Sequence, residues 1–110
     1  MSATKSPPTT IAAVKDIVPK LAELTEKVLF GEVWARPGLS KRDRSFATVA
    51  ALIALHRPDQ LKGHIWRALD NGVTREELAE LFTHPAFYAG WPNGISAAQV
   101  AKQVYEERGA

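Results

Sequence analysis

Three cationic side chains flank one apolar segment of this chain, and together they suit the binding and protonation of a small anion. Arg44 precedes the alanine-rich run 46–55, Arg57 follows it, and His64 lies one to two turns into the next expected helix. Arginine binds carboxylates through paired hydrogen bonds, and histidine exchanges protons near neutral pH. The pattern therefore predicts an anion pocket at the ends of a buried helix.

Each of the three residues also has an ordinary structural interpretation. His64 is three residues after Leu61 and four before Ala68, so it lies on the apolar stripe of its helix. A histidine in such a position often bonds a backbone carbonyl inside the core. Either arginine could form a surface salt bridge instead of a substrate contact. The sequence leaves both interpretations open.

Further candidates lie nearer the carboxyl end of the chain. His84 could line the same cavity or bond the last carbonyls of its own helix. Tyr88 and Trp91 each join a large apolar body to one polar group. Packing is the commoner use of such side chains, so their positions alone do not assign them to a site.

Other chemistries have little support in the sequence. The chain has no cysteine, which excludes disulfides, thiol catalysis and thiolate metal sites. The three histidines lack the spacing of a metal-binding motif within one helix. No glycine-rich phosphate loop and no GxSxG elbow occurs.

Composition and charge fit one folded domain. The chain has 110 residues, of which 45% are apolar and 24% charged, a balance typical of globular proteins. The net charge is only +2 and acids alternate with bases, which gives nucleic-acid binding little support. No apolar stretch has the length of a membrane span, and the N-terminus lacks the hydrophobic run of a secretory signal. We expect a cytoplasmic protein without a membrane partner.

The apolar spacing predicts an all-α fold, a single domain of about five to six helices. Residues 1–9, rich in Ser, Thr and Pro, are expected to form a flexible arm, and residues 10–110 the helical domain. One helix should begin near Pro19, and others should cover about 41–56, 58–70, 74–84 and 95–107. The expected boundaries are a break at 31–38, an N-cap at Ser40, a stop at Gly72 and a capping box of Thr74 with Glu77.

Two features of these helices carry further expectations. Pro85 lacks a backbone N–H and should end or kink its helix near residues 83–84. The helix at 41–56 is apolar nearly all round, and a small domain cannot easily surround such a helix alone. We therefore expect contacts between subunits to cover part of it.

The stretch from about Phe30 to Val104 resembles the carboxymuconolactone decarboxylase family. The resemblance is carried by four pieces in order, VWxRPGLS, RDRSxxTVAAL, HxxxALDNGVTREEL and HxAFYAGWP. It implies an all-α, alkylhydroperoxidase D-like fold that assembles as a homotrimer or homohexamer. Pro85 departs from the family pattern, in which an aliphatic residue usually continues the helix, and this change could displace His84.

The family resemblance implies one of two chemistries. Its alkylhydroperoxidase D branch uses a CxxC pair, with a glutamate before it and a histidine after it. On this sequence those positions hold Ser45, Arg57, Gln60 and His64, so only the histidine is retained. A thiol peroxidase requires a thiol, and this chemistry is therefore disfavoured.

The other branch resembles the γ-carboxymuconolactone decarboxylases of aromatic catabolism. It implies a lyase without metal or organic cofactor, acting on a small carboxylated lactone or a similar enolisable acid, because such a substrate is its own electron sink. Arg44 and Arg57 would hold the carboxylate or the developing enolate, and His64 would deliver a proton. The pocket would be completed by Gln60, His84, Tyr88 and Trp91. A non-catalytic oligomeric module that binds a small anion is the alternative.

Overall fold

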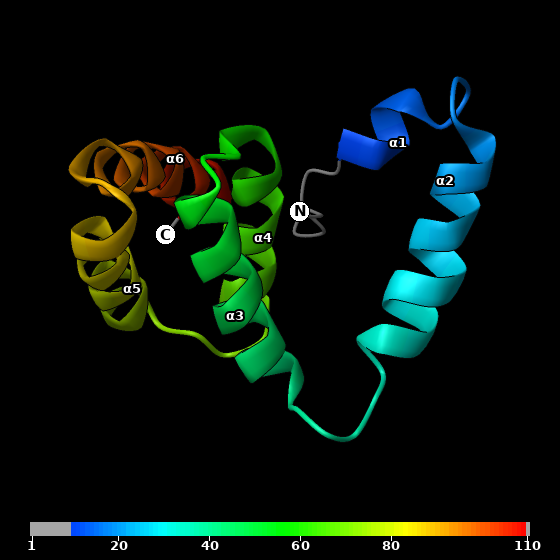
Figure 1. Ribbon diagram of the computed structural model, residues 1–110, viewed down its shortest axis with the longest axis horizontal. Helices are drawn as coiled ribbons and strands as arrows, with labels where there is room; N and C mark the ends of the chain where they lie inside the picture. The colour runs from blue at the N-terminus through cyan, green and yellow to red at the C-terminus, as the bar shows by residue number, and fades with distance from the viewer. Residues whose placement is uncertain (1–9, 110) are drawn as a thin grey trace.

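The computed structural model describes residues 10–109, and every regular element in this range is helical (Figure 1). Four long helices, α3 to α6, pack together, while the first helices stand to one side of them as a separate arm. The predicted all-α fold is confirmed. The flexible arm predicted at residues 1–9 lies outside the described residues.

The helical arm consists of α1 (Thr10–Val14), α2 (Pro19–Leu24) and the η1 segment (Thr25–Val33), in which α2 continues as a wider π-helix. Pro19 occupies the first turn of α2, as predicted. The break expected from residue 31 begins later, since the helical hydrogen bonds continue to Val33. None of these three elements buries a side chain.

Two central helices follow, α3 (Lys41–Ala54) and α4 (Pro58–Asp70). The Ser40 hydroxyl accepts a 3.0 Å hydrogen bond from the Asp43 backbone N–H, which confirms the predicted N-cap. His56 adopts a left-handed φ of 54°, and this residue reverses the chain between the two helices. At the other end of the pair, Asn71 donates a 3.0 Å hydrogen bond to the fully buried Ser45.

The last two helices are α5 (Arg75–Ala89) and α6 (Trp91–Arg108). Both hydrogen bonds of the capping box between Thr74 and Glu77 form, each 3.0 Å long. Of the two effects predicted for Pro85, the helix end is wrong, because α5 continues to Ala89. A proline inside a helix removes one N–H and crowds the carbonyl four residues before it, at a cost of about 3 kcal/mol, and burial of Leu81, Phe82 and Ala86 on the same helix outweighs that cost. The last helix begins at Trp91 rather than Ile95.

The hydrophobic core lies between α3, α4, α5 and α6. The apolar side chains that α5 and α6 bury or partly bury in it include Leu78, Leu81, Phe82, Ala97, Val100, Ala101 and Val104. On α3, Val49 and Ile53 are fully buried, but Ala51 is exposed, and Leu55, directly after the helix, remains 62% exposed. The chain therefore covers one side of α3 and leaves part of its apolar surface uncovered.

Close packing of α5 against α6 depends on Gly94. A Cβ atom at this position would lie 2.9 Å from the Phe82 carbonyl oxygen and 3.0 Å from the Ala86 Cβ. We expect Gly94→Ala to destabilise the protein by about 1–2 kcal/mol, because overpacking outweighs a helix-propensity gain of about 1 kcal/mol. Urea unfolding measures the change. Gly38→Ala is the control, since a Cβ there meets nothing within 4 Å, and equal stability of the two variants would contradict the packing argument.

Candidate functional site

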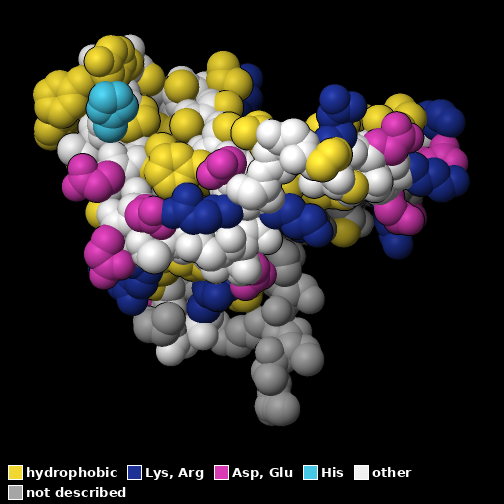
Figure 2. Space-filling view, turned by 90° about the horizontal axis from the view of Figure 1, so that it is seen from below, with side chains coloured by type: hydrophobic (Ala, Val, Ile, Leu, Met, Phe, Trp, Pro, Cys, Tyr) yellow, Lys and Arg dark blue, Asp and Glu magenta, His cyan; other side chains and the backbone are white. Residues whose placement is uncertain are grey.

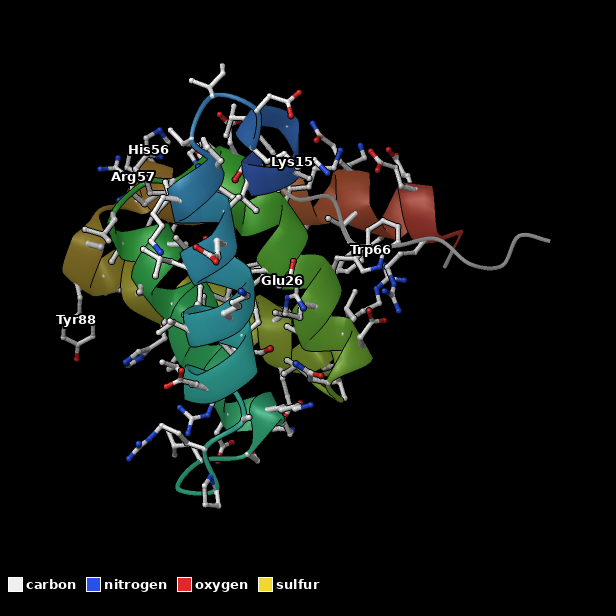
Figure 3. The ribbon with its side chains drawn as sticks, turned by 90° about the vertical axis from the view of Figure 1, so that its right-hand side faces the viewer. Lys15, Glu26, His56, Arg57, Trp66 and Tyr88 are labelled. Atoms are coloured by element: carbon white, nitrogen blue, oxygen red, sulfur yellow. The ribbon has the colours of Figure 1, made fainter. Side chains whose placement is uncertain are left out.

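A cavity of about 210 Å³ lies between the helical arm and α4. Figure 3 looks at the arm from its outer side and shows it crossing in front of the bundle. The arm supplies one wall, and α4 supplies the other. The lining residues are Thr10, Ile11, Thr25, Leu29 and Phe30 from the arm, with Asp59, Gln60, Gly63, His64 and Arg67 from α4.

His64 contributes its ring to this cavity, and its environment is unusual for a histidine. Burial, and to a smaller extent the positive charge of Arg67, lower its pKa from the ordinary 6.5 to about 4. The Trp34 ring stacks on it with centroids 6.1 Å apart. The Nδ1 atom is buried and has no hydrogen-bond partner within residues 10–109. In the alternative interpretation, His64 is a core histidine that bonds a backbone carbonyl. Its Nδ1 atom does not form such a hydrogen bond.

Gln60 lies one turn before His64 and also lines the cavity, so the structure brings these two predicted residues together. Asp59 is beside Gln60 at the exposed start of α4. The spacing of 60, 64 and 67 places three polar side chains along one face of α4.

Arg67 is a residue of this site that the sequence pattern did not single out. Its guanidinium carbon lies 4.5 Å from the centroid of the Phe30 ring, and its Nε atom is buried without a hydrogen-bond partner among the described residues. The signal that could have found it is its position three residues after His64, on the same helix face.

The two arginines predicted to act with His64 do not line this cavity. Arg44 is half-buried and donates a 3.1 Å hydrogen bond to the Arg36 carbonyl in the connection before α3. Arg57 is exposed and donates a 3.3 Å hydrogen bond to the Leu55 carbonyl. Figure 3 shows Arg57 beside His56 at the outer edge of the molecule. Within one chain, His64 is thus the one of the three predicted catalytic residues that lines this cavity.

The remaining predicted pocket residues lie on another surface. His84 and Tyr88 are ring neighbours with centroids 5.1 Å apart, and Tyr88 is 81% exposed. Its side chain points away from the bundle in Figure 3. Trp91 borders an apolar groove of about 290 Å³ between α5 and α6. Figure 2 shows hydrophobic side chains gathered on the side of the molecule where α5 lies.

The comparison with known proteins identifies the family. The model of the carboxymuconolactone decarboxylase family matches residues 19–103, which include α4 and most of the arm. The chain belongs to this family. The resemblance seen in the sequence is thereby confirmed, and the absence of cysteine agrees with the branch that lacks the CxxC pair.

Three proteins with known names or sequences show which relatives this family member is similar to. It is 45% identical over 80 residues to a 4-carboxymuconolactone decarboxylase of Acinetobacter baylyi, covering 73% of this chain and 60% of the relative. It is 35% identical over 85 residues to the nitrosuccinic acid decarboxylase npaB of Metarhizium robertsii, covering 77% and 59%. An uncharacterized 15.0 kDa protein of Paracoccus denitrificans is 31% identical over 98 residues, covering 86% and 72%. The chain thus spans about 60% of the length of the two named decarboxylases.

The described part of this family member contains neither a metal site nor a membrane-spanning helix. Within residues 10–109, no group of three or more His, Asp or Glu side chains is placed to hold a metal ion. None of the helices in that range combines the length and the apolar character that crossing a membrane requires.

The low pKa of His64 has a consequence for stability. Between pH 6.5 and about 4, His64 of the unfolded chain takes up a proton that the folded protein excludes, so the free energy of unfolding falls as the pH decreases through this window. We expect wild type to lose more stability than His64→Gln between pH 7 and pH 4.5, measured by urea unfolding at one protein concentration. Equal losses in the two proteins would show that His64 is not held neutral by burial.

Proposed function

We propose that this protein is a decarboxylase that removes CO₂ from a small carboxylated lactone or a similar enolisable acid. The observation that carries the proposal is the cavity lined by His64 and Gln60 in a chain of this family. Two of its relatives are named as decarboxylases of carboxylic acids. The charged side chains that line the cavity are Asp59, at the exposed start of α4, and Arg67, one turn after His64, and the positive charge at the His64 end favours an anionic substrate there.

The proposed reaction breaks the bond between a carbon atom and its carboxylate. CO₂ leaves, and the electron pair passes through the conjugated substrate to the lactone carbonyl, which becomes an enolate. A proton must then return to carbon, and His64 is the group in the cavity that suits this transfer. Because the substrate accepts the electron pair itself, the proposal requires neither a metal nor an organic cofactor.

The protonation state of His64 fits this role once an anion is bound. With a pKa near 4, the ring is neutral at pH 7 and carries one N–H and one acceptor nitrogen. A bound carboxylate places negative charge beside the ring, which opposes the effects of burial and of Arg67 and raises the pKa. Substrate binding therefore prepares His64 to hold and transfer a proton.

The roles of Arg44, Arg57, His84, Tyr88 and Trp91 in substrate binding stay predictions. In one chain these side chains lie away from the His64 cavity, and Arg57, Tyr88 and Trp91 are exposed. They can take part only where a second subunit places them beside a cavity, so their roles are tied to assembly.

We further propose that the protein is a homotrimer or a homohexamer. The apolar side chains Ile17, Leu21, Leu24 and Val28 follow helical spacing along α2 and its flanks and are 39–78% exposed. A second group is exposed around the α5–α6 corner: Phe87, Tyr88, Trp91 and Ile95. Apolar surface of this extent is typical of an interface between proteins.

The activity is tested by following the ultraviolet absorbance of γ-carboxymuconolactone with purified protein. We expect turnover by wild type and a decrease of kcat by about 10²- to 10⁴-fold in His64→Gln, because a positioned proton donor contributes about that factor. His56→Asn is the control, since His56 is exposed and asparagine tolerates its left-handed backbone. Saturable binding of the lactone without turnover would instead favour the non-catalytic anion-binding module.

Assembly is tested by light scattering coupled to size exclusion. We expect wild type to have the mass of three or six chains and Phe87→Asp to shift toward smaller species, because a carboxylate in an apolar interface is costly to desolvate. The control is Gln103→Asp, which adds the same charge at an exposed polar position of α6. A monomeric wild type would contradict the proposed assembly.

A further inference from the structure

Among the half-buried arginines, Arg44 and Arg67 each have a buried Nε atom without a hydrogen-bond partner in the described residues, but of these two only Arg67 borders the cavity. Arg42 forms an ion pair with Glu77, and Arg108 forms one of 2.9 Å with Asp70. Arg67 forms no ion pair within residues 10–109, although its Nε atom is buried and its side chain borders the cavity. Arg67 is half-buried and its Nε atom is shielded from water, so an anion that approaches through the cavity would stabilise its charge.

The surroundings of Arg67 leave its hydrogen-bonding edge for a planar anion. Phe30 covers the guanidinium at 4.5 Å from its ring centroid and provides a cation–π contact, which accepts no hydrogen bond from the N–H groups. The edge of a guanidinium matches the two oxygens of a carboxylate. A volume of about 210 Å³ lies below the roughly 300–1,000 Å³ of sites for drug-sized ligands, which indicates a smaller acid.

The chemistry of decarboxylation determines which carboxylate Arg67 can usefully hold. The carboxylate that departs as CO₂ loses its negative charge on the way to the transition state. A guanidinium bound to that group would stabilise the ground state more than the transition state and would slow the reaction. A guanidinium bound to a carboxylate that stays on the substrate has no such cost.

We propose that Arg67 is a specificity-determining residue that binds the retained carboxylate of a small dicarboxylic substrate, while His64 serves the carbon that loses CO₂. This inference rests on the proposed decarboxylase function. In the step itself, the bond between the substrate carbon and the departing carboxylate breaks, its electron pair forms the enolate, and a proton is added to a carbon of that enolate. Arg67 keeps its protons throughout; it holds the substrate in place, and its charge contributes to the low pKa of His64.

Kinetics of the variants Arg67→Gln and Arg67→Lys test this assignment. We expect Arg67→Gln to raise KM by about 10- to 100-fold, the value of a charge-assisted hydrogen bond, and to change kcat by less than about threefold. Arg67→Lys keeps the charge but loses the paired geometry, so its KM should lie between those of wild type and Arg67→Gln. If Arg67→Gln does not fold, Arg67→Lys provides the test. Arg75→Gln is the matched control, because Arg75 also stacks on an aromatic ring, Tyr105, at 4.1 Å, but borders a different pocket.

Direct binding of two probes separates this inference from the proposed activity. Calorimetry should show that wild type binds succinate more tightly than its neutral analogue succinamide, and that Arg67→Gln reduces succinate affinity to the succinamide level. Succinamide affinity should be the same in both proteins. A purely structural Arg67 would change the affinities for both probes or for neither.

Failure of the Arg67 assignment and failure of the decarboxylase proposal give different results in these experiments. Turnover by wild type with unchanged KM and unchanged succinate affinity in Arg67→Gln would overturn the role of Arg67 and leave the decarboxylase proposal intact. Succinate binding that depends on Arg67, without turnover of any lactone tested, would support the carboxylate site and overturn its assignment to a retained carboxylate, together with the decarboxylase proposal.

Discussion

The stacking of Trp34 on His64 is the contact on which the site depends. Within residues 10–40, Trp34 is the single buried side chain, and it follows directly on the η1 segment. Its ring contacts Phe30 on one side, with centroids 5.8 Å apart, and His64 of α4 on the other. This column of aromatic rings anchors the end of an otherwise exposed arm to the bundle, and the space left between arm and α4 is the cavity.

Helix α4 carries two adjacent stripes of side chains, one facing the hydrophobic core and the other facing the cavity. Leu61, Ile65 and Ala68 face the hydrophobic core, and each is at most 2% exposed. The next stripe, at 60, 64 and 67, faces the arm. Because the same helix is anchored by its core stripe, the polar stripe is held rigidly against the cavity. The arm then desolvates it, and the low pKa of His64 is the result of that desolvation together with the charge of Arg67.

The sequence predicted most helices well where the signal was local. Ser40 and the pair of Thr74 with Glu77 bond their own helix starts within a few residues, so their geometry needs no distant contact. The helix end predicted at Pro85 was wrong because the cost of a proline depends on how much of the surrounding helix face is buried. That burial is set by tertiary packing. Arg67 was missed for a related reason: a lone arginine in a helix gives no sign of whether an aromatic ring from the arm covers it.

The sequence by itself determined the all-α fold, the helix caps and the exclusion of thiol chemistry. These follow from periodicity, from short-range hydrogen bonds and from the residue types present, whereas the proposed role of His64 also rests on the family resemblance. Only the tertiary structure decided which charged side chains accompany His64. Arg44 and Arg57 lie near it along the chain but leave α3 and its following turn in other directions, while Arg67 and Gln60 share its helix face. Side chains meet according to the face and the end of the helix that carries them, and that arrangement is fixed by packing rather than by distance along the sequence.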